Sequence, residues 1–275
     1  MKKKLVFKLT LFVCLLSVGT INAQSIVSYK LPAIFNFDFE VTQKVFGNKN
    51  PKDTCNTHIF YTKNGDYAGA RMNGKSNING NLFMVMSRDG IVILFDERKK
   101  EITIVSLRKL MTDLTSLTKY FRMDSLMARM QKNKDGKDLE SVKTGKSKLV
   151  GSYTSEEYAV TDSRGHKGFV WLAKVEFNGP ADYILGAMGG NFQQMMGMMS
   201  GSATRYILMH DLMQSKTLVT EVELTDSTEA KSLNLHTVSI RAVSKSVSTS
   251  GYRINNYSNM SMHEIFQAEM KKWNE

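Results

Sequence analysis

The stretch Ile34–Val45, "IFNFDFEVTQKV", decides the fold class of this chain. Its apolar residues alternate with polar ones and are Phe35, Phe37, Phe39 and Val41. A period of two is typical of a β-strand that buries one of its sides. The stretch therefore predicts a half-buried strand close to the start of the mature chain.

Similar patterns, separated by turn signals, continue through the first half of the chain. Asn64-Gly65 and Asp89-Gly90 are dipeptides typical of tight hairpin turns, and the charged residues 96–101 mark a further turn. Short connections of this kind join antiparallel neighbours. We therefore predict antiparallel strands within residues 57–72 and 81–107.

The hydrophobic period then changes to steps of three and four residues between Leu107 and Met130, which indicates an amphipathic helix. The next stretch, 131–147, is polar and highly charged, and we predict a solvated loop there. Strands resume within 148–177, 217–226 and 233–246. A C-terminal amphipathic helix follows, with Ser261 as its N-cap.

These elements predict a mainly β protein of the α+β class. We expect one large curved antiparallel sheet, or half-barrel, covered on one face by a few amphipathic helices. The mature chain, 24–275, would form a single domain in two halves, 24–130 and 148–275, joined by the polar loop 131–147. Such a sheet would leave an apolar groove beneath its helices.

The first residues have the order of a secretory signal peptide. Three lysines at positions 2–4 precede an apolar run, and small or polar residues end at Ala23. This order predicts cleavage after Ala23 and export to the periplasm or the cell exterior of a bacterium. No later stretch is apolar enough to span a bilayer, so we expect no transmembrane segment after cleavage.

The charge of the chain is positive but dispersed. The formal net charge is +11, and the loss of the four signal-peptide lysines lowers it to +7. Because no motif joins basic with aromatic residues, we expect no nucleic-acid partner. Cys55 is the only cysteine left after cleavage of the signal peptide, so it has no partner for an internal disulfide, and its role stays open.

One fragment resembles a nucleotide-binding motif, but its context argues against this role. "GARMNGKS", Gly69–Ser76, fits the P-loop pattern letter for letter. A P-loop leads directly into a helix whose first amides hold phosphate. Here a second Asn-Gly turn and a strand follow. The patterns G-x-S-x-G and H-E-x-x-H do not occur. We therefore expect neither enzymatic activity nor a cofactor.

The segment 189–202, "GGNFQQMMGMMSGS", is rich in methionine. Thioether sulfur binds Cu(I), so the segment suggests a periplasmic copper site. Methionine is also an adaptable residue of cores and of apolar contact surfaces, and it is frequent throughout this chain. Both interpretations stay open. The copper alternative involves Met195, Met196, Met198, Met199, Met209, His210 and Met213.

The second half resembles an exported bacterial family, domain of unknown function 4412. The residues that carry the resemblance are Tyr153, Tyr158, Val160, Val170 and Trp171. The glycine and the cysteine of the family pattern fall on Ser152 and Ser155, so any role of that cysteine is absent here. More distantly, the layout resembles the periplasmic lipoprotein carriers, which implies a half-barrel that holds acyl chains.

We therefore expect a non-enzymatic envelope protein that binds a hydrophobic ligand, a lipid or acyl chain, or an envelope partner in an apolar concavity. Besides copper binding, a structural or stress-related protein that binds polypeptides is a further alternative. The residues expected to line or gate the groove lie on the predicted helix and in the methionine-rich segment. They are Leu110, Met111, Leu114, Leu117, Phe121, Phe192, Met195, Met196, Met198 and Met199.

Overall fold

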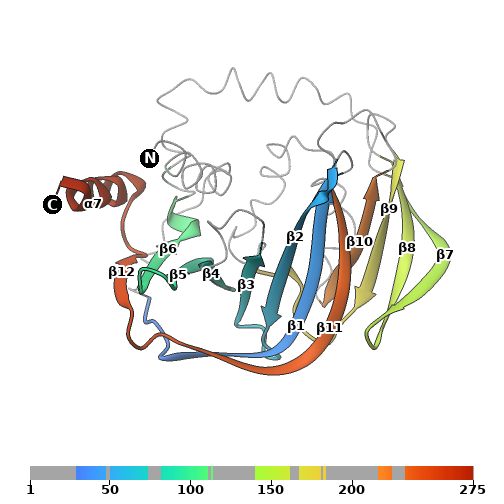
Figure 1. Cartoon of the computed structure of the whole chain (residues 1–275), viewed down its shortest axis with the longest axis horizontal. Coiled ribbons are helices and arrows are strands. Elements are labelled where there is room, and N and C mark those ends of the chain that lie inside the picture. The colour runs from blue at the N-terminus through green and yellow to red at the C-terminus, as the bar shows by residue number, and fades with distance from the viewer. Residues whose placement is uncertain are drawn as a thin grey trace, which may run out of the picture.

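The chain folds mainly as one large β-sheet, seen in a computed structural model (Figure 1). The structure describes residues 29–47, 50–73, 82–110, 113, 140–161, 167–180, 182–183, 216–224 and 233–274. The strands are β1 (Ile34–Gly47), β2 (Asn50–Tyr61), β3 (Tyr67–Asn73), β4 (Leu82–Ser87), β5 (Ile91–Asp96), β6 (Glu101–Ser106), β7 (Glu140–Val150), β8 (Tyr153–Thr161), β9 (Lys167–Lys174), β10 (Thr217–Leu224), β11 (Leu233–Ser248) and β12 (Arg253–Tyr257). The helix α7 (Met262–Asn274) follows them.

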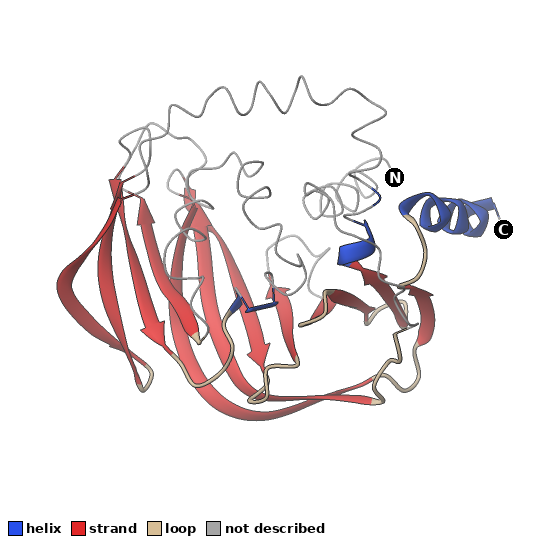
Figure 2. Ribbon diagram, turned by 180° about the vertical axis from the view of Figure 1, so that it is seen from behind, coloured by secondary structure: helices blue, strands red, loops and turns tan. Residues whose placement is uncertain are grey.

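Both halves of the chain contribute to this sheet. The strand order is β12-β6-β5-β4-β3-β2-β1-β11-β10-β9-β8-β7, and only the β12–β6 pair is parallel. The long strands β1 and β11 pair at its centre and curve along the bottom of the view in Figure 1. The curve brings β12 beside β6, as Figure 2 shows from behind. The predicted large, curved and mainly antiparallel sheet is therefore confirmed.

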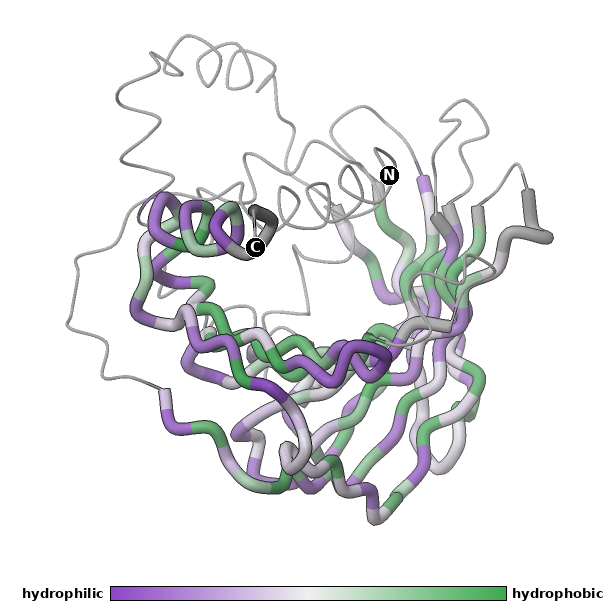
Figure 3. Tube along the Cα trace, turned by 60° about the vertical axis from the view of Figure 1, so that its left-hand side comes forward, coloured by the Kyte–Doolittle hydropathy of each residue, from purple (hydrophilic) through white to green (hydrophobic). Residues whose placement is uncertain are grey.

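The sheet buries apolar residues on both of its faces, whereas we expected one covered face. We call the face with Val41, Ile59 and Val222 face 1, and the face with Glu40 and Phe60 face 2, because cross-strand partners share a face. The alternation is visible as changes of hydropathy along the strands (Figure 3). The face 2 core consists of Phe35, Phe37, Phe60, Phe83, Val85, Ile91, Ile93, Phe95, Ile102 and Ile104. A second core consists of Phe39, Val41, Tyr61, Val150, Ala173, Val175, Phe177, Tyr183, Leu218 and Ile240.

The four apolar residues of β1 divide between these two cores. All four are buried, as their alternation predicts. Phe35 and Phe37 belong to the first core, however, and Phe39 and Val41 to the second. The pairing with β11 shifts its register between Phe37 and Phe39. A register shift bends a strand locally, so one alternating pattern serves two cores.

The predicted hairpin turns are confirmed. Gly65 and Gly90 follow Asn64 and Asp89, and their φ angles are 72° and 81°. Glycine adopts this left-handed conformation without a steric penalty. The Gly90 N–H donates to the Ser87 carbonyl oxygen at 3.0 Å, which closes the β4–β5 turn. The local sequence therefore sets these antiparallel connections.

Two predicted boundaries can be compared with the described residues. Helical residues 107–110 follow β6 directly and fit the start of the predicted helix, of which 111–112 and 114–130 lie outside the described residues. The loop predicted over 131–147 is wrong from residue 140 onward, because β7 begins there. A strand at the edge of a sheet can be polar on both faces, so its sequence lacks the alternation expected of a half-buried strand.

The C-terminal helix begins as predicted. The Ser261 hydroxyl accepts a bond from the Glu264 N–H at 3.3 Å, and the Glu264 carboxylate accepts one from the Ser261 N–H at 2.6 Å. This reciprocal pair is a capping box, which fixes the first turn of α7. Ile265 is buried, whereas Phe266 is exposed. Within the described part of the chain, no helix combines the length and the apolarity needed to cross a bilayer.

Candidate ligand-binding site

Most of the predicted site residues lie outside the described part of the chain. Leu110 is the one groove residue that the structure describes, and its side chain is buried, beyond the end of β6. The predicted residues that fall outside the described ranges are Met111, Leu114, Leu117, Phe121, Phe192, Met195, Met196, Met198, Met199, Met209, His210 and Met213.

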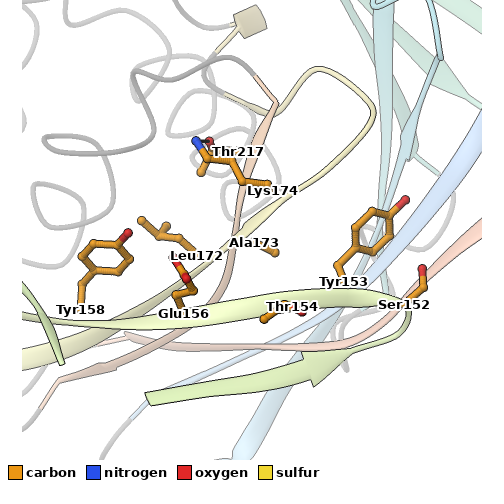
Figure 4. A pocket seen from close by; sticks show the side chains of 9 residues that line it. All are labelled: Ser152, Tyr153, Thr154, Glu156, Tyr158, Leu172, Ala173, Lys174 and Thr217. Carbon is orange, nitrogen blue, oxygen red and sulfur yellow. Dashed lines mark hydrogen bonds between the residues drawn. The ribbon is translucent and has the colours of Figure 1, made fainter. Parts of the chain in front are cut away.

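A pocket of about 400 Å³ lies on β8, β9 and the start of β10 (Figure 4). Its volume falls within the range of small-molecule sites, roughly 300–1,000 Å³. Aromatic, aliphatic, hydroxyl and charged side chains all contribute to it. The lining residues are Ser152, Tyr153, Thr154, Glu156, Tyr158, Leu172, Ala173, Lys174 and Thr217.

The pocket opens on face 1, because strand register links its residues to that face. Tyr158 pairs with Val170, and Val170 pairs with Val222. Val222 continues the same row to Leu235 and Val45. Residues aligned across neighbouring strands point to the same side of a sheet. The row of Glu156 and Leu172 therefore lies on face 1, whereas Ala173 of the second core pairs with Leu218 on the opposite side of β9.

Strand pairing also brings the lining residues together. Leu172 lies opposite Glu156 across the β8–β9 pair, and Lys174 lies opposite Thr217 across the β9–β10 pair. The tight turn before Tyr153 contains Gly151, whose φ is 63°. A Cβ atom there would stand 2.7 Å from the Ile240 carbonyl oxygen. Only glycine allows β8 to begin so close to β11.

One cation, Lys174, lines the pocket and can attract an anion. The Lys174 ammonium donates to the Thr217 hydroxyl at 3.1 Å, and Figure 4 shows the two side chains together. The Glu156 carboxylate already accepts a bond from the Lys143 ammonium at 2.6 Å. Lys143 thus balances the charge of Glu156, and a second carboxylate, Glu176, accepts the hydrogen bond of the lining residue Tyr153. An ammonium group attracts anions, and the effect is stronger where apolar side chains exclude water.

An aromatic series extends from the pocket wall into the second core. The Tyr153 ring contacts Phe177 edge-on at 6.5 Å between centroids, and Phe177 stacks on Tyr61 at 4.6 Å. Tyr183 lies on the other side, 6.3 Å from Tyr61. The Tyr153 hydroxyl donates to the Glu176 carboxylate at 2.9 Å. Burial, together with this bond, raises the pKa of Tyr153 to about 12, so the phenol is neutral.

Face 2 carries two carboxylates that are held by cations. The Glu40 carboxylate accepts a bond from Arg241 Nε at 2.9 Å and contacts His58 Nδ1 at 2.8 Å. Burial raises the pKa of Glu40, but these two partners lower it more, and it lies below its ordinary value. Glu221 contacts Lys148 and lies 3.1 Å from His236 Nδ1. Glu40 and Glu221 thus both form ion pairs within the folded chain.

A second carboxyl group stands beside Glu221. Burial, and then the hydrogen bond and the charge of Glu221, raise the pKa of Glu223. Burial also raises the pKa of Glu221, but Lys148 outweighs it and lowers that pKa. Lys148 lies 4.0 Å above the Trp171 ring. Because Lys148 and His236 both contact Glu221, the carboxyl pair resembles a structural network more than a reactive site.

Of the sequence motif Gly69–Ser76, the described part, Gly69–Asn73, lies in a β-strand, and residues 74–76 lie outside the described residues. Its first five residues belong to β3, which pairs antiparallel with β2 and β4. A Cβ atom on Gly69 would stand 2.6 Å from Phe83 and 2.8 Å from Phe37. The glycine thus serves close packing of rings, not the approach of a phosphate.

Cys55 and His58 do not form a nucleophile pair. The Cys55 thiol contacts the Asn56 carbonyl oxygen at 3.9 Å, whereas His58 contacts Glu40. Residues three apart in a strand point to opposite faces. Across the described ranges, no three His, Cys, Asp or Glu side chains gather as a metal site.

Comparisons with known proteins show similarity to solved structures only. No protein-family model matches the chain, so the resemblance to domain of unknown function 4412 is not confirmed. No curated protein matches it either. An uncharacterised conserved protein from Thermus thermophilus superposes with a TM-score of 0.35 and 6% identity, over 75% of this chain and 79% of that one.

Pseudomonas aeruginosa MucB, in its complex with MucA, superposes with a TM-score of 0.33 and 11% identity over 75% of this chain. A structure of MucB alone gives a TM-score of 0.31 and 11% identity over 74% of this chain. The matched region spans about half of MucB, 52% and 53% of the two chains. At these TM-scores the superpositions assign neither a family nor a function.

The sequence interpretation missed the pocket, although two of its residues carried the family resemblance. Tyr153 and Tyr158 match the family pattern, but this pattern does not mark them as site residues. The other strands contribute Leu172, Lys174 and Thr217. The sequence around these residues contains no motif that would mark them as part of a site. Only the pairing of β8 with β9 and of β9 with β10 brings these residues together.

Proposed function

We propose that this chain is an exported binding protein that holds an amphiphile, an acyl chain with an anionic head group, in the face 1 pocket. The observation that carries the proposal is the pocket lining, which combines aromatic and aliphatic side chains with the Lys174 ammonium. Pockets with an apolar wall and a few placed polar groups are typical of small-molecule sites.

The apolar wall suits an acyl chain. Tyr153, Tyr158 and Leu172 supply aromatic and aliphatic surface, and Figure 4 shows them along the length of the pocket. Leu149 pairs with Thr154 of the lining, and its side chain is 73% exposed. Each methylene group moved from water to such surface contributes about 0.8 kcal/mol. An acyl chain thus gains affinity without a strong polar contact.

The head group would lie at Lys174. The side chain is exposed, and its ammonium lies 3.1 Å from a second potential donor, the Thr217 hydroxyl. An ammonium and a hydroxyl together offer several donors to carboxylate or phosphate oxygens. The Glu156 carboxylate forms an ion pair with the Lys143 ammonium. It therefore repels an anionic head group less than an unpaired carboxylate would. The proposed site is therefore polar at one wall. It differs in this from the wholly apolar groove that the sequence predicts.

Native mass spectrometry of the chain purified from bacterial membranes tests the proposal. We expect an adduct with the mass of an acyl amphiphile on the wild type and its loss on Leu172→Asp, which places a charge in the apolar wall. Ile254→Asp is the matched control, because Ile254 is 51% exposed on β12, at the other end of the strand order. Loss of the adduct from both variants, or no adduct on the wild type, argues against the pocket.

A further inference from the structure

The pocket lining contains two side chains of opposite charge, Lys174 and Glu156. Each of them has a different partner. The Lys174 ammonium donates to the Thr217 hydroxyl at 3.1 Å, and the Glu156 carboxylate accepts a bond from the Lys143 ammonium at 2.6 Å. The pocket therefore offers a cation and an anion to the same ligand, whereas a purely anionic head group uses only the cation.

Strand register sets the separation of these two charges. Glu156 lies directly opposite Leu172 in the β8–β9 pair, and Lys174 follows two positions later on the same face of β9. Glu156 and Lys174 are therefore diagonal neighbours, whose Cα atoms are roughly 7–8 Å apart in such a pair. Figure 4 shows Lys174 beside Thr217 and Glu156 beside Leu172. A ligand whose ammonium and acidic groups are a few bonds apart can reach both side chains.

The ion pair between Lys143 and Glu156 is open to exchange. Their side chains are 52% and 41% exposed, and ion pairs at such exposure contribute little to stability. Lys143 belongs to the edge strand β7 and is not among the lining residues. Its ammonium nevertheless shows which donor the Glu156 carboxylate accepts. The ammonium group of a bound ligand can therefore replace Lys143 at Glu156 and keep that carboxylate paired.

We propose that the head group bound in this pocket is zwitterionic, with its phosphate or carboxylate at Lys174 and its ammonium at Glu156. This inference rests on the proposed function and adds the class of head group to it. Phosphoethanolamine is a head group of this class, because a two-carbon link joins its phosphate to a primary ammonium. A head group with a phosphate alone leaves Glu156 to Lys143 and makes no bond to that carboxylate.

The test compares two probes with the same single acyl chain, lysophosphatidylethanolamine and lysophosphatidylglycerol, titrated below their critical micelle concentrations. Both carry one phosphodiester, and only the first carries an ammonium group. We expect the wild type to bind the ethanolamine probe about threefold to tenfold more tightly, because it adds a charge-assisted bond to Glu156. Glu156→Gln should remove this preference and leave binding of the glycerol probe unchanged or slightly tighter.

Two further variants separate a local contact from the general charge of the pocket. Lys143→Gln removes the competing ammonium, so the preference for the ethanolamine probe should increase. Glu176→Gln is the matched control. Glu176 is not a lining residue, and it accepts the Tyr153 hydroxyl at 2.9 Å, a bond that glutamine can also accept. This control removes the same charge as Glu156→Gln, but the preference should keep its wild-type value.

Equal binding of the two probes by the wild type overturns the inference, while the proposed function stands. A preference that persists in Glu156→Gln overturns it as well, and so does an equal loss of preference in Glu176→Gln. Urea midpoints check that the variants fold, which we expect because the Lys143 and Glu156 side chains are exposed. If neither probe binds the wild type, the proposed function fails together with this inference.

Discussion

Phe60 and Tyr61 are consecutive residues of β2, yet their rings enter different cores. Phe60 lies 5.8 Å from Phe37 and 5.9 Å from Phe83 on face 2. Tyr61 stacks on Phe177 in the other core. This end of β2 is thus buried on both sides, and β1 and β2 contribute residues to both cores. Changes on either face should therefore affect global stability.

Gly69 provides a test of the face 2 core. We expect Gly69→Ala to lower the free energy of unfolding by about 1–3 kcal/mol, because the new methyl group would overlap Phe83 and Phe37. Urea denaturation followed by circular dichroism measures this change. In a Phe83→Leu background the same substitution should cost less, since the nearest ring is gone. Equal costs in both backgrounds would show that the overlap is not the cause.

Glu40 provides a test of the face 2 ion pairs. We expect Glu40→Gln to lower the free energy of unfolding at pH 7 by about 2 kcal/mol, because a buried carboxylate that serves both Arg241 and His58 is lost. Glu97→Gln is the control, since the Glu97 and Arg71 side chains are 34% and 30% exposed and that pair is worth less. Equal losses in the two variants contradict this ranking.

The Glu40 contribution should also depend on pH. Its pKa in the folded chain lies below the ordinary value of 4.5. A carboxyl group of this kind stabilises the fold at pH values above its unfolded pKa, and the stabilisation is lost as the pH falls through the folded pKa. The stability difference between the wild type and Glu40→Gln should therefore shrink as the pH falls below about 4.5. A difference that does not shrink in this range contradicts the assignment.

The methionine-rich segment tests the copper alternative. Cu(I) binding through sulfur predicts a loss of affinity when Met195, Met196, Met198 and Met199 are all changed to Leu. An apolar contact surface predicts that the changes are tolerated, because Leu and Met have similar volumes. A competition titration with a Cu(I) chelator measures the affinity. Unchanged Cu(I) affinity in the variant excludes these residues as ligands, and an absence of binding by the wild type excludes the alternative.

The strands were predictable where the local sequence sets their period and their turns. Phe35 to Val41 alternate strictly, and the glycines of Asn64-Gly65 and Asp89-Gly90 adopt the expected left-handed conformation. Ser261 caps α7 as its place before an apolar helical pattern predicts. These features depend on residues within a few positions of each other. Local physics therefore accounts for the fold class and for most strand positions.

The division into two cores was not predictable in this way. Phe37 and Phe39 have the same local pattern, and only the register shift against β11 separates them. The first part of β7 was missed because its polar residues pair with partners on other strands, such as Lys143 with Glu156. The pocket also depends on long-range pairing. Lys174 and Thr217 are 43 positions apart and form one hydrogen bond.

The central claim, that the pocket binds an anionic amphiphile through Lys174, is tested most directly by a titration with a fluorescent fatty acid and its methyl ester. We expect the wild type to bind both saturably, and Lys174→Gln to weaken binding of the acid about threefold to tenfold while leaving the ester unchanged. Lys167→Gln, at the other end of β9, should change neither affinity. Absence of saturable binding by the wild type, or equal weakening of acid and ester by Lys174→Gln, would contradict the claim.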